Sequence, residues 1–324
     1  MMKEGSAIGG LDPHLRVYVA GHRGMVGSAV WRALTRAGFT DLCGASSAEV
    51  DLRDRAATFG LLSAQRPDVV VIAAAKVGGI KANDSQPVEF LSDNLRIQTN
   101  LMDAAHAVGV GRLLFLGSSC IYPKFAAQPI VESSLLTGPL EPTNDAYAIA
   151  KIAGVHLVQA YRREYGRQWI SAMPTNLYGP GDNFDLATSH VLPALIRRFE
   201  QARAGDLPTV TLWGTGTPRR EFLHVDDLAE ACLHLLEYYD EPDPINVGVG
   251  EDLPIAELAA LVADITGFGG QIDWDTSMPD GTPRKLLDVS RIKALGWSPR
   301  IGLRDGITST VDWYRDNART AAAR

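Results

Sequence analysis

The amino-acid sequence predicts an α/β protein whose parallel sheet is covered by helices on both faces. Five short apolar runs have the length and composition of buried strands, and they lie at residues 16–20, 69–73, 113–116, 169–173 and 245–248. Stretches with the helical spacing of apolar residues separate the early runs, at 25–37 and 94–108. Because strands that alternate with helices need crossover connections, neighbouring strands are expected to run parallel in a doubly wound sheet.

The composition excludes several classes of protein. Of the 324 residues, 46% are hydrophobic and 21% are charged, which is ordinary for a folded globular chain. The formal net charge of −7 opposes nucleic-acid binding, because such domains carry clustered basic surfaces. No apolar run reaches the roughly 18 residues that span a bilayer, and the three distant cysteines form neither a disulfide framework nor a zinc motif. We therefore predict a cytoplasmic enzyme without metal, nucleic-acid or membrane partners.

The chain also changes character along its length. After residue 174, glycine, proline, asparagine and aspartate crowd residues 178–183 and 280–283, which is typical of loops that line a cleft. We predict three units: a flexible N-terminal tail at 1–15, a dinucleotide-binding domain made of 16–174 and 221–249, and a smaller, partly interleaved α/β substrate lobe made of 175–220 and 250–324.

Three glycines, Gly21, Gly24 and Gly27, follow the first predicted strand and open the next helix. Glycine permits the tight turn and brings backbone N–H groups close to a pyrophosphate at the positive end of the helix. The loop therefore predicts a Rossmann-type dinucleotide site. The alternative is that the glycines only form a turn and let the helix pack closely. Arg23 can meet a ribose 2′-phosphate, and in the segment of the second strand, residues 41–47, no carboxylate stands where an NAD site would hold the 2′-hydroxyl. Both features favour NADP.

A tyrosine and a lysine, Tyr147 and Lys151, stand four residues apart on one face of a predicted helix. A nearby ammonium lowers the pKa of a phenol from about 10, so that the tyrosine can exchange a proton with a carbonyl oxygen. Ser118 follows the strand at 113–116, where open α/β sheets present ligand-binding residues, and it can donate to the same oxygen. Taken singly, these residues could be an exposed helix pair and a turn cap. With the glycine loop, they predict hydride transfer at a carbonyl.

Seven motifs narrow this interpretation, and they are GHRGMVG (21–27), AAAKVGGI (73–80), GSSCIYP (117–123), EPTN (141–144), PTNLYG (174–179), REFLHVDD (220–227) and PDGTPRKLLD (279–288). Together they resemble the GDP-L-fucose synthase family within the extended short-chain dehydrogenase/reductases, over nearly the whole chain beyond residue 16. The resemblance implies a homodimer that converts GDP-4-keto-6-deoxy-D-mannose to GDP-L-fucose by two epimerisations and one NADPH-dependent reduction.

The resemblance also implies residue roles. Ser118, Tyr147 and Lys151 match the catalytic set, while Cys120 matches a base and His190 an acid on opposite faces of the sugar ring. A thiol acts as a base if a neighbouring cation favours its thiolate, and a histidine donates protons near neutral pH. The residues alone would also allow Cys120 to be a small buried side chain and His190 a surface residue at a helix start.

The binding positions follow from the same residue-by-residue match. Positions that match substrate binding are Arg198, Trp213, Arg220 and Asp280. Positions that match NADP binding are Gly21, His22, Arg23, Gly24, Met25, Val26, Gly27, Ser47, Asp51, Leu52, Leu116, Gly117, Ser118, Ser119, Lys151, Pro174, Thr175, Asn176, Leu177 and His190. Family members often carry arginine where this chain has Ala45, Ser46 and Ser47, so we expect a weaker preference for NADP over NAD.

Four alternatives share parts of this pattern. A nucleotide-sugar 4,6-dehydratase would carry carboxylates after the strand-end hydroxyl, where Ser119 and Cys120 supply none. A simple 4-epimerase needs no base for ring carbons. A catalytically silent NADP-binding regulator is opposed by the intact Ser118, Tyr147 and Lys151, and a serine hydrolase by the missing G-x-S-x-G turn.

Overall fold

The structure, a computed structural model, describes residues 11–278 and 280–321. Most of the predicted N-terminal tail, residues 1–10, lies outside the described residues. The central element is a six-stranded sheet in the order β2 (Leu42–Cys43), β1 (Val17–Ala20), β3 (Val69–Ile72), β4 (Arg112–Leu116), β5 (Gln168–Pro174) and β10 (Ile245–Val247). Every neighbouring pair in it runs parallel, which confirms the predicted doubly wound sheet. The chain reverses its direction of travel between β1 and β3, and such a reversal is where this fold binds ligands.

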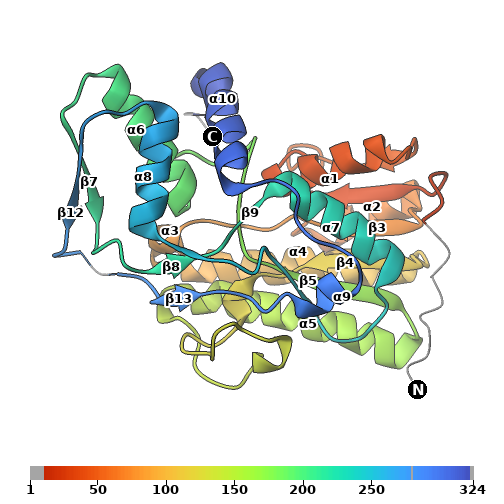
Figure 1. The fold of residues 1–324 in the computed structure, drawn as a ribbon. Helices are drawn as coiled ribbons and strands as arrows, with labels where there is room; N and C mark the ends of the chain where they lie inside the picture. The colour runs from red at the N-terminus through yellow and green to blue at the C-terminus, as the bar shows by residue number, and fades with distance from the viewer. Residues whose placement is uncertain (1–10, 279, 322–324) are drawn as a thin grey trace.

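Helices cover both faces of the sheet (Figure 1). On one face lie α1 (Met25–Arg36) and α7 (Val225–Tyr238), and on the other lie α2 (Arg55–Gln65), α4 (Pro87–Ala107) and α5 (Asp145–Tyr165). The helix expected at 94–108 begins seven residues earlier, at Pro87. Proline is tolerated there because the first turn of a helix makes no use of its missing N–H.

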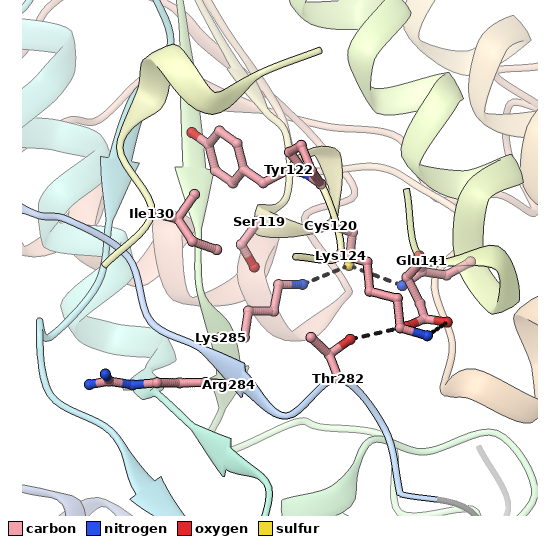
Figure 2. A pocket seen from close by; sticks show the side chains of 11 residues that line it. Ser119, Cys120, Tyr122, Lys124, Ile130, Glu141, Thr282, Arg284 and Lys285 are labelled. Atoms are coloured by element: carbon pink, nitrogen blue, oxygen red, sulfur yellow. Dashed lines mark hydrogen bonds and ion pairs between the residues drawn. The ribbon is translucent and has the colours of Figure 1, made fainter. Parts of the chain in front are cut away.

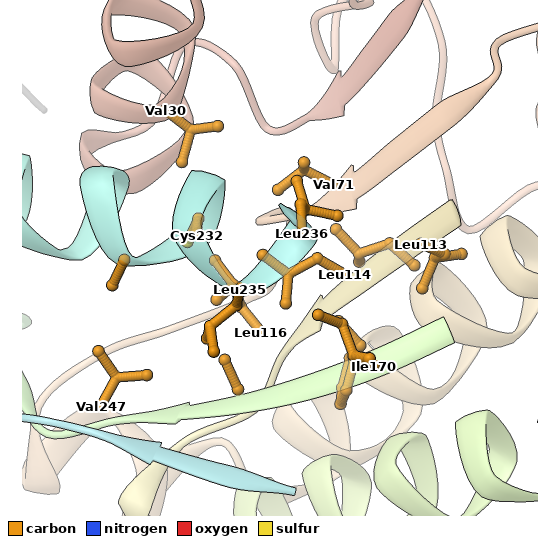
Figure 3. Packing of buried hydrophobic residues seen from close by; sticks show 14 of the residues in the cluster. Val30, Val71, Leu113, Leu114, Leu116, Ile170, Cys232, Leu235, Leu236 and Val247 are labelled. Carbon is orange, nitrogen blue, oxygen red and sulfur yellow. The ribbon is translucent and has the colours of Figure 1, made fainter. Parts of the chain in front are cut away.

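The main core lies between this sheet and its helices (Figure 3). Val71, Leu114 and Ile170 project from three adjacent strands and meet Val30 of α1 and Leu235 of α7. All five are at most 1% exposed, and each such aliphatic side chain contributes about 1.5–3 kcal/mol on burial. This packing fixes the carboxyl ends of the strands, where the predicted site residues lie.

A second, smaller core belongs to the lobe that holds most of the second half of the chain (Figure 1). It forms among α6 (Val191–Ala204), α8 (Ile255–Thr266), α10 (Leu303–Ala321) and the parallel pair β7 (Thr209–Trp213) and β12 (Gln271–Asp275). Two small sheets join the lobe to the main domain. One pairs β6 (Asn176–Tyr178) with β9 (Phe222–His224), and the other has the order β11 (Leu253–Pro254), β8 (Arg219–Arg220) and β13 (Arg284–Lys285).

The predicted division into two domains stays a prediction. Val289, Ile292 and Trp297 pack in the main core, although the predicted substrate lobe contains them. No helix in the described part of the chain is both long and apolar enough to cross a membrane.

Candidate active site

The glycine loop forms a cradle between β1 and α1. Gly21 has φ +82°, a conformation that strongly favours glycine, and Gly24 is the N-cap of α1. A Cβ built on Gly27 would lie 2.1 Å from the Gly21 carbonyl oxygen, so only glycine fits at this position. The exposed helix N-terminus and the side-chain-free turn fit the pyrophosphate of a dinucleotide.

Gly27→Ala is expected to weaken NADPH binding by roughly tenfold or more, because overpacking of this kind typically costs about 1–3 kcal/mol. The matched control is Gly60→Ala in α2, where a Cβ would meet no heavy atom within 4 Å. That change should leave binding intact and slightly raise the melting temperature, since alanine favours helices. Fluorescence titration with NADPH measures both variants, and equal affinities would contradict the cradle.

The far end of the loop faces the segment after β2. Arg23 is exposed and lies 4.0 Å from Glu49, whose carboxylate accepts the Ser46 amide at 2.7 Å and the Ser46 hydroxyl at 2.6 Å. The sequence analysis did not assign a role to Glu49. The predicted residue Asp51 is ion-paired with Arg53 at 2.9 Å. The Glu49 carboxylate therefore lies beside Arg23, the residue that is expected to bind the 2′-phosphate.

At the end of β5, two predicted cofactor positions make structural hydrogen bonds. The Thr175 amide donates to the Val247 carbonyl at 3.0 Å, and the Asn176 side chain donates to the Glu221 carbonyl at 2.8 Å. The first of these bonds continues the link between β5 and β10, and the second joins β6 to the residue before β9. These contacts hold the edge of the sheet on which the dinucleotide would lie.

Ser118, Tyr147 and Lys151 come together at the carboxyl end of β4. Ser118 is the N-cap of the short 3₁₀ helix η1 (Ser119–Ile121). Tyr147 and Lys151 lie one turn apart on α5, as predicted, and Tyr147 is hydrogen-bonded to Ser118. The buried Lys151 ammonium donates to the Leu116 carbonyl at 2.8 Å. The two hydroxyls expected to meet a carbonyl oxygen therefore lie together at one strand end.

The predicted effect of Lys151 on Tyr147 is wrong. Burial raises the pKa of the Tyr147 phenol, and the nearby Cys120 raises it further, while the hydrogen bond with Ser118 offsets only part of this. Burial also lowers the pKa of Lys151 to about 7. Within the described part of the chain, the Lys151 ammonium donates to the Leu116 carbonyl and not to the Tyr147 hydroxyl. A phenol that stays protonated is the form that donates a proton to a carbonyl oxygen.

Cys120 has two polar partners that the sequence analysis did not assign. The Lys285 ammonium lies 3.3 Å from its sulfur, and the Asn144 amide lies 3.4 Å from it (Figure 2). Burial alone would raise the pKa of the Cys120 thiol, but Lys285, the Ser118 hydroxyl and Arg220 together outweigh burial and lower it. The thiol is therefore poised to ionise, as a base requires.

His190 is the N-cap residue of α6, and its side chain is exposed to solvent. Desolvation nevertheless lowers its pKa, and the charge of Lys285 lowers it further. Hydrogen bonding of the Gly79 amide to the Thr188 carbonyl, at 2.8 Å, holds this loop against the segment that precedes α3 (Ile80–Ser85). At neutral pH the imidazole is mainly neutral, so His190 donates protons best at mildly acidic pH.

The predicted substrate residues gather on the lobe. Arg198 donates to the Thr211 carbonyl of β7 at 3.2 Å, two residues before Trp213, whose side chain is 58% exposed. The Asp280 carboxylate accepts the Thr215 amide at 2.9 Å and its hydroxyl at 2.7 Å. These residues form one polar rim with an exposed indole, which suits a nucleotide.

Arg220 connects that rim to the thiol. Burial lowers the pKa of its guanidinium, while the charges of Cys120, Glu141 and Asp280 act in the opposite direction. Among the residues that the structure describes, no group of three or more His, Cys, Asp or Glu side chains could hold a metal ion.

A glycine cradle for a dinucleotide and a protonated phenol for a carbonyl oxygen lie at neighbouring strand ends, which places the protein among oxidoreductases of the short-chain dehydrogenase/reductase type. Residues 17–248 match the NAD dependent epimerase/dehydratase family, and the chain belongs to that family.

Relatives extend along almost the whole chain. GDP-L-fucose synthase 1 of Arabidopsis thaliana is 55% identical over 306 residues, which are 94% of this chain and 95% of that protein. GDP-L-fucose synthase of Escherichia coli (strain K12) is 52% identical over 311 residues, which are 93% and 97%. The crystal structure of a GDP-L-fucose synthetase from Naegleria fowleri bound to NADP has a TM-score of 0.90 at 29% identity, and covers 98% of this chain and 100% of that one. These likenesses confirm the resemblance and the predicted Rossmann-type fold.

Proposed function

We propose that the chain converts GDP-4-keto-6-deoxy-D-mannose to GDP-L-fucose by inverting two ring carbons and reducing the ketone with NADPH. The observation that carries this proposal is the Cys120 thiol, which faces a lysine ammonium directly beside the Ser118–Tyr147 hydroxyl pair. A simple ketoreductase needs a proton donor and a hydride. A base at the same site adds the ability to remove protons from the carbons that flank the ketone.

The two epimerisations use one oxygen. Removal of a proton from either flanking carbon leaves an enolate whose charge lies on the ketone oxygen, where the hydroxyls of Ser118 and Tyr147 stabilise it. Cys120 takes the proton from one face of the ring, and His190 returns a proton to the other face. Exchange with solvent then restores the thiolate and the imidazolium, so protons and charge balance over each inversion.

The reduction uses the same hydroxyls. Residues 21–27 would hold NADPH, which supplies the hydride when bound. Tyr147 gives its proton to the ketone oxygen, and the raised pKa of its phenol keeps that proton in place until the step. Lys151, held by the Leu116 carbonyl, lies one turn further along the same helix.

The lobe residues suit the nucleotide part of the substrate. Guanidinium groups such as those of Arg198 and Arg220 bind diphosphates through paired hydrogen bonds, and the exposed Trp213 ring can cover a base or sugar. Arg220 lies between this rim and Cys120, so a bound diphosphate would direct the sugar toward the thiol.

We further propose a homodimer that works in the cytoplasm. Val88 of α4 and Ile149 of α5 expose apolar side chains on two of the helices that cover one face of the sheet, and a second copy could bury them. The three cysteines are free, which suits a reducing compartment. Sedimentation equilibrium measures the oligomeric state directly.

The decisive assay combines the chain with NADPH and GDP-4-keto-6-deoxy-D-mannose. Consumption of NADPH, with GDP-L-fucose identified by NMR, is the expected result. A reduced sugar in which neither carbon has been inverted would show a reductase without epimerase activity and would refute the proposal. No oxidation of NADPH despite its binding would favour a regulator instead.

Arg23→Ala is expected to lower kcat/KM for NADPH by roughly tenfold or more and to leave kcat/KM for NADH nearly unchanged, because hydrogen bonds to charged groups are strong. Only NADPH carries the 2′-phosphate that Arg23 would meet. Arg36→Ala, which removes an exposed arginine at the other end of α1, is the control. An equal loss with both cofactors would remove Arg23 from the 2′-phosphate site, and a native preference for NADH would overturn the assignment of NADP.

A further inference from the structure

Three cationic side chains, Lys124, Arg284 and Lys285, line the pocket beside Cys120 (Figure 2). They differ in the group with which each one pairs. Lys124 and Arg284 each pair with a carboxylate within 3.0 Å. Lys285 instead directs its ammonium at the Cys120 sulfur, 3.3 Å away. Within the described part of the chain, that sulfur is the one hydrogen-bond partner of the ammonium. Its positive charge therefore acts on the thiol rather than on a neighbouring carboxylate.

The backbone around Lys285 is held on both sides. In β13, Lys285 lies beside Arg220 of the parallel strand β8. The amides of the next two residues donate to the Gln128 side chain at 2.9 Å and to the Glu221 carboxylate at 3.1 Å. Glu221 is fully buried, so this anchor is shielded from water. These contacts hold the backbone of β13 in place, and the backbone in turn fixes the position of the Lys285 side chain.

Several elements contribute groups to the surroundings of the sulfur. The Asn144 amide donates to it from η3 (Pro142–Asn144), at 3.4 Å. The charged and titratable groups that surround it are Lys285 and Arg220 on β13 and β8, Tyr147 on α5, and Lys124 and Glu141 across the pocket. The closest of the cations is Lys285, and among the cations of the described residues it is the one that hydrogen-bonds to the sulfur.

We propose that Lys285 is a positioning residue that holds Cys120 as the thiolate that removes protons from the carbons beside the ketone. The inference rests on the function proposed above. In the step, the C–H bond breaks, its proton forms the S–H bond, and its electron pair passes to the enolate. Lys285 stays an ammonium throughout, and it stabilises the thiolate before the proton moves.

Lys285→Met is expected to slow the alkylation of Cys120 by iodoacetamide at pH 7 by roughly tenfold, because an adjacent opposite charge typically favours an ionised group by at least that factor. The midpoint of alkylation should move to higher pH. Lys285→Arg should restore most of the rate, since it restores the charge. Mass spectrometry of the peptide that contains Cys120 measures this with the chain alone, without sugar or cofactor.

Lys124→Met is the matched control, because it removes a cation from the same pocket that is paired with Glu141. It should leave the alkylation midpoint of Cys120 unchanged. An unchanged midpoint in folded Lys285→Met, with folding judged from its melting temperature, would overturn the proposal.

Solvent-deuterium incorporation into the sugar supplies a second readout. In Lys285→Met it should fall at neutral pH, and the rise of its rate with pH should move to higher pH, whereas a purely structural role would lower the rate equally at every pH. If native protein failed to convert GDP-4-keto-6-deoxy-D-mannose but alkylation still depended on Lys285, the proposed function would be refuted and the Lys285–Cys120 pairing supported.

Discussion

Replacement of Cys120 by serine is expected to lower solvent-deuterium incorporation at both ring carbons by about 10²–10⁴-fold, the usual contribution of a general base. Serine has nearly the same shape, but its hydroxyl does not ionise in the range in which a thiol does. Lys285 would then face a neutral oxygen in place of a thiolate. Binding of NADPH should be unchanged, because the glycine loop lies on a different strand end.

Cys43 provides the control, since it is also half-buried but lies in β2. Burial raises the pKa of its thiol to about 11, so Cys43 stays protonated at neutral pH, while the pKa of Cys120 is lowered. Cys43→Ser should therefore leave deuterium incorporation at the native rate. Native incorporation in Cys120→Ser would remove the thiol from the mechanism.

The pH dependence of the same exchange follows from two groups. Cys120 must be a thiolate, so the rate rises with pH, and the lowered pKa of the thiol moves this rise to lower pH than an ordinary cysteine gives. His190 must be an imidazolium, so the rate falls again at higher pH, and its lowered pKa moves this fall to lower pH as well. The bell-shaped profile should therefore be displaced toward acid relative to that of an unperturbed pair.

Features that depend on local sequence were predicted well. The glycine spacing after 16–20 specified the turn into α1, because a side chain at Gly27 would overlap the Gly21 carbonyl. The spacing of Tyr147 and Lys151 placed them one turn apart on α5, since residues four apart share a helix face. Both sequence patterns are short, and each has a single physical explanation.

Features that depend on contacts between distant segments were not predicted. Lys285 meets Cys120 across 165 positions of sequence, and β13, which carries it, is only two residues long and has no periodicity to detect. Asn144 reaches the same sulfur from a short 3₁₀ helix. The pKa of Tyr147 was predicted in the wrong direction, because burial and the nearby Cys120 raise it, and neither is visible in a four-residue spacing.

Tyr147→Phe is expected to lower NADPH oxidation with the keto sugar by about 10²–10⁴-fold, because it removes the proton that the ketone oxygen must receive. The phenylalanine ring keeps the edge-on contact with Phe90, whose centre lies 6.3 Å from that of Tyr147, so the fold should be retained. Ser118 still donates to the same oxygen. Deuterium incorporation should therefore fall less than reduction does, whereas Cys120→Ser should primarily impair deuterium incorporation.

That contrast separates the two chemistries at one site. Tyr165→Phe, at the exposed end of the same helix, controls for the loss of a hydroxyl from α5 and should keep the native rate. Stopped-flow absorbance measures NADPH oxidation, and NMR measures deuterium at the ring carbons. Native rates of NADPH oxidation in Tyr147→Phe would mean that another group protonates the ketone oxygen. Equal losses of both activities would mean that enolate formation depends on the phenol as strongly as hydride transfer does, which would leave Ser118 a minor role.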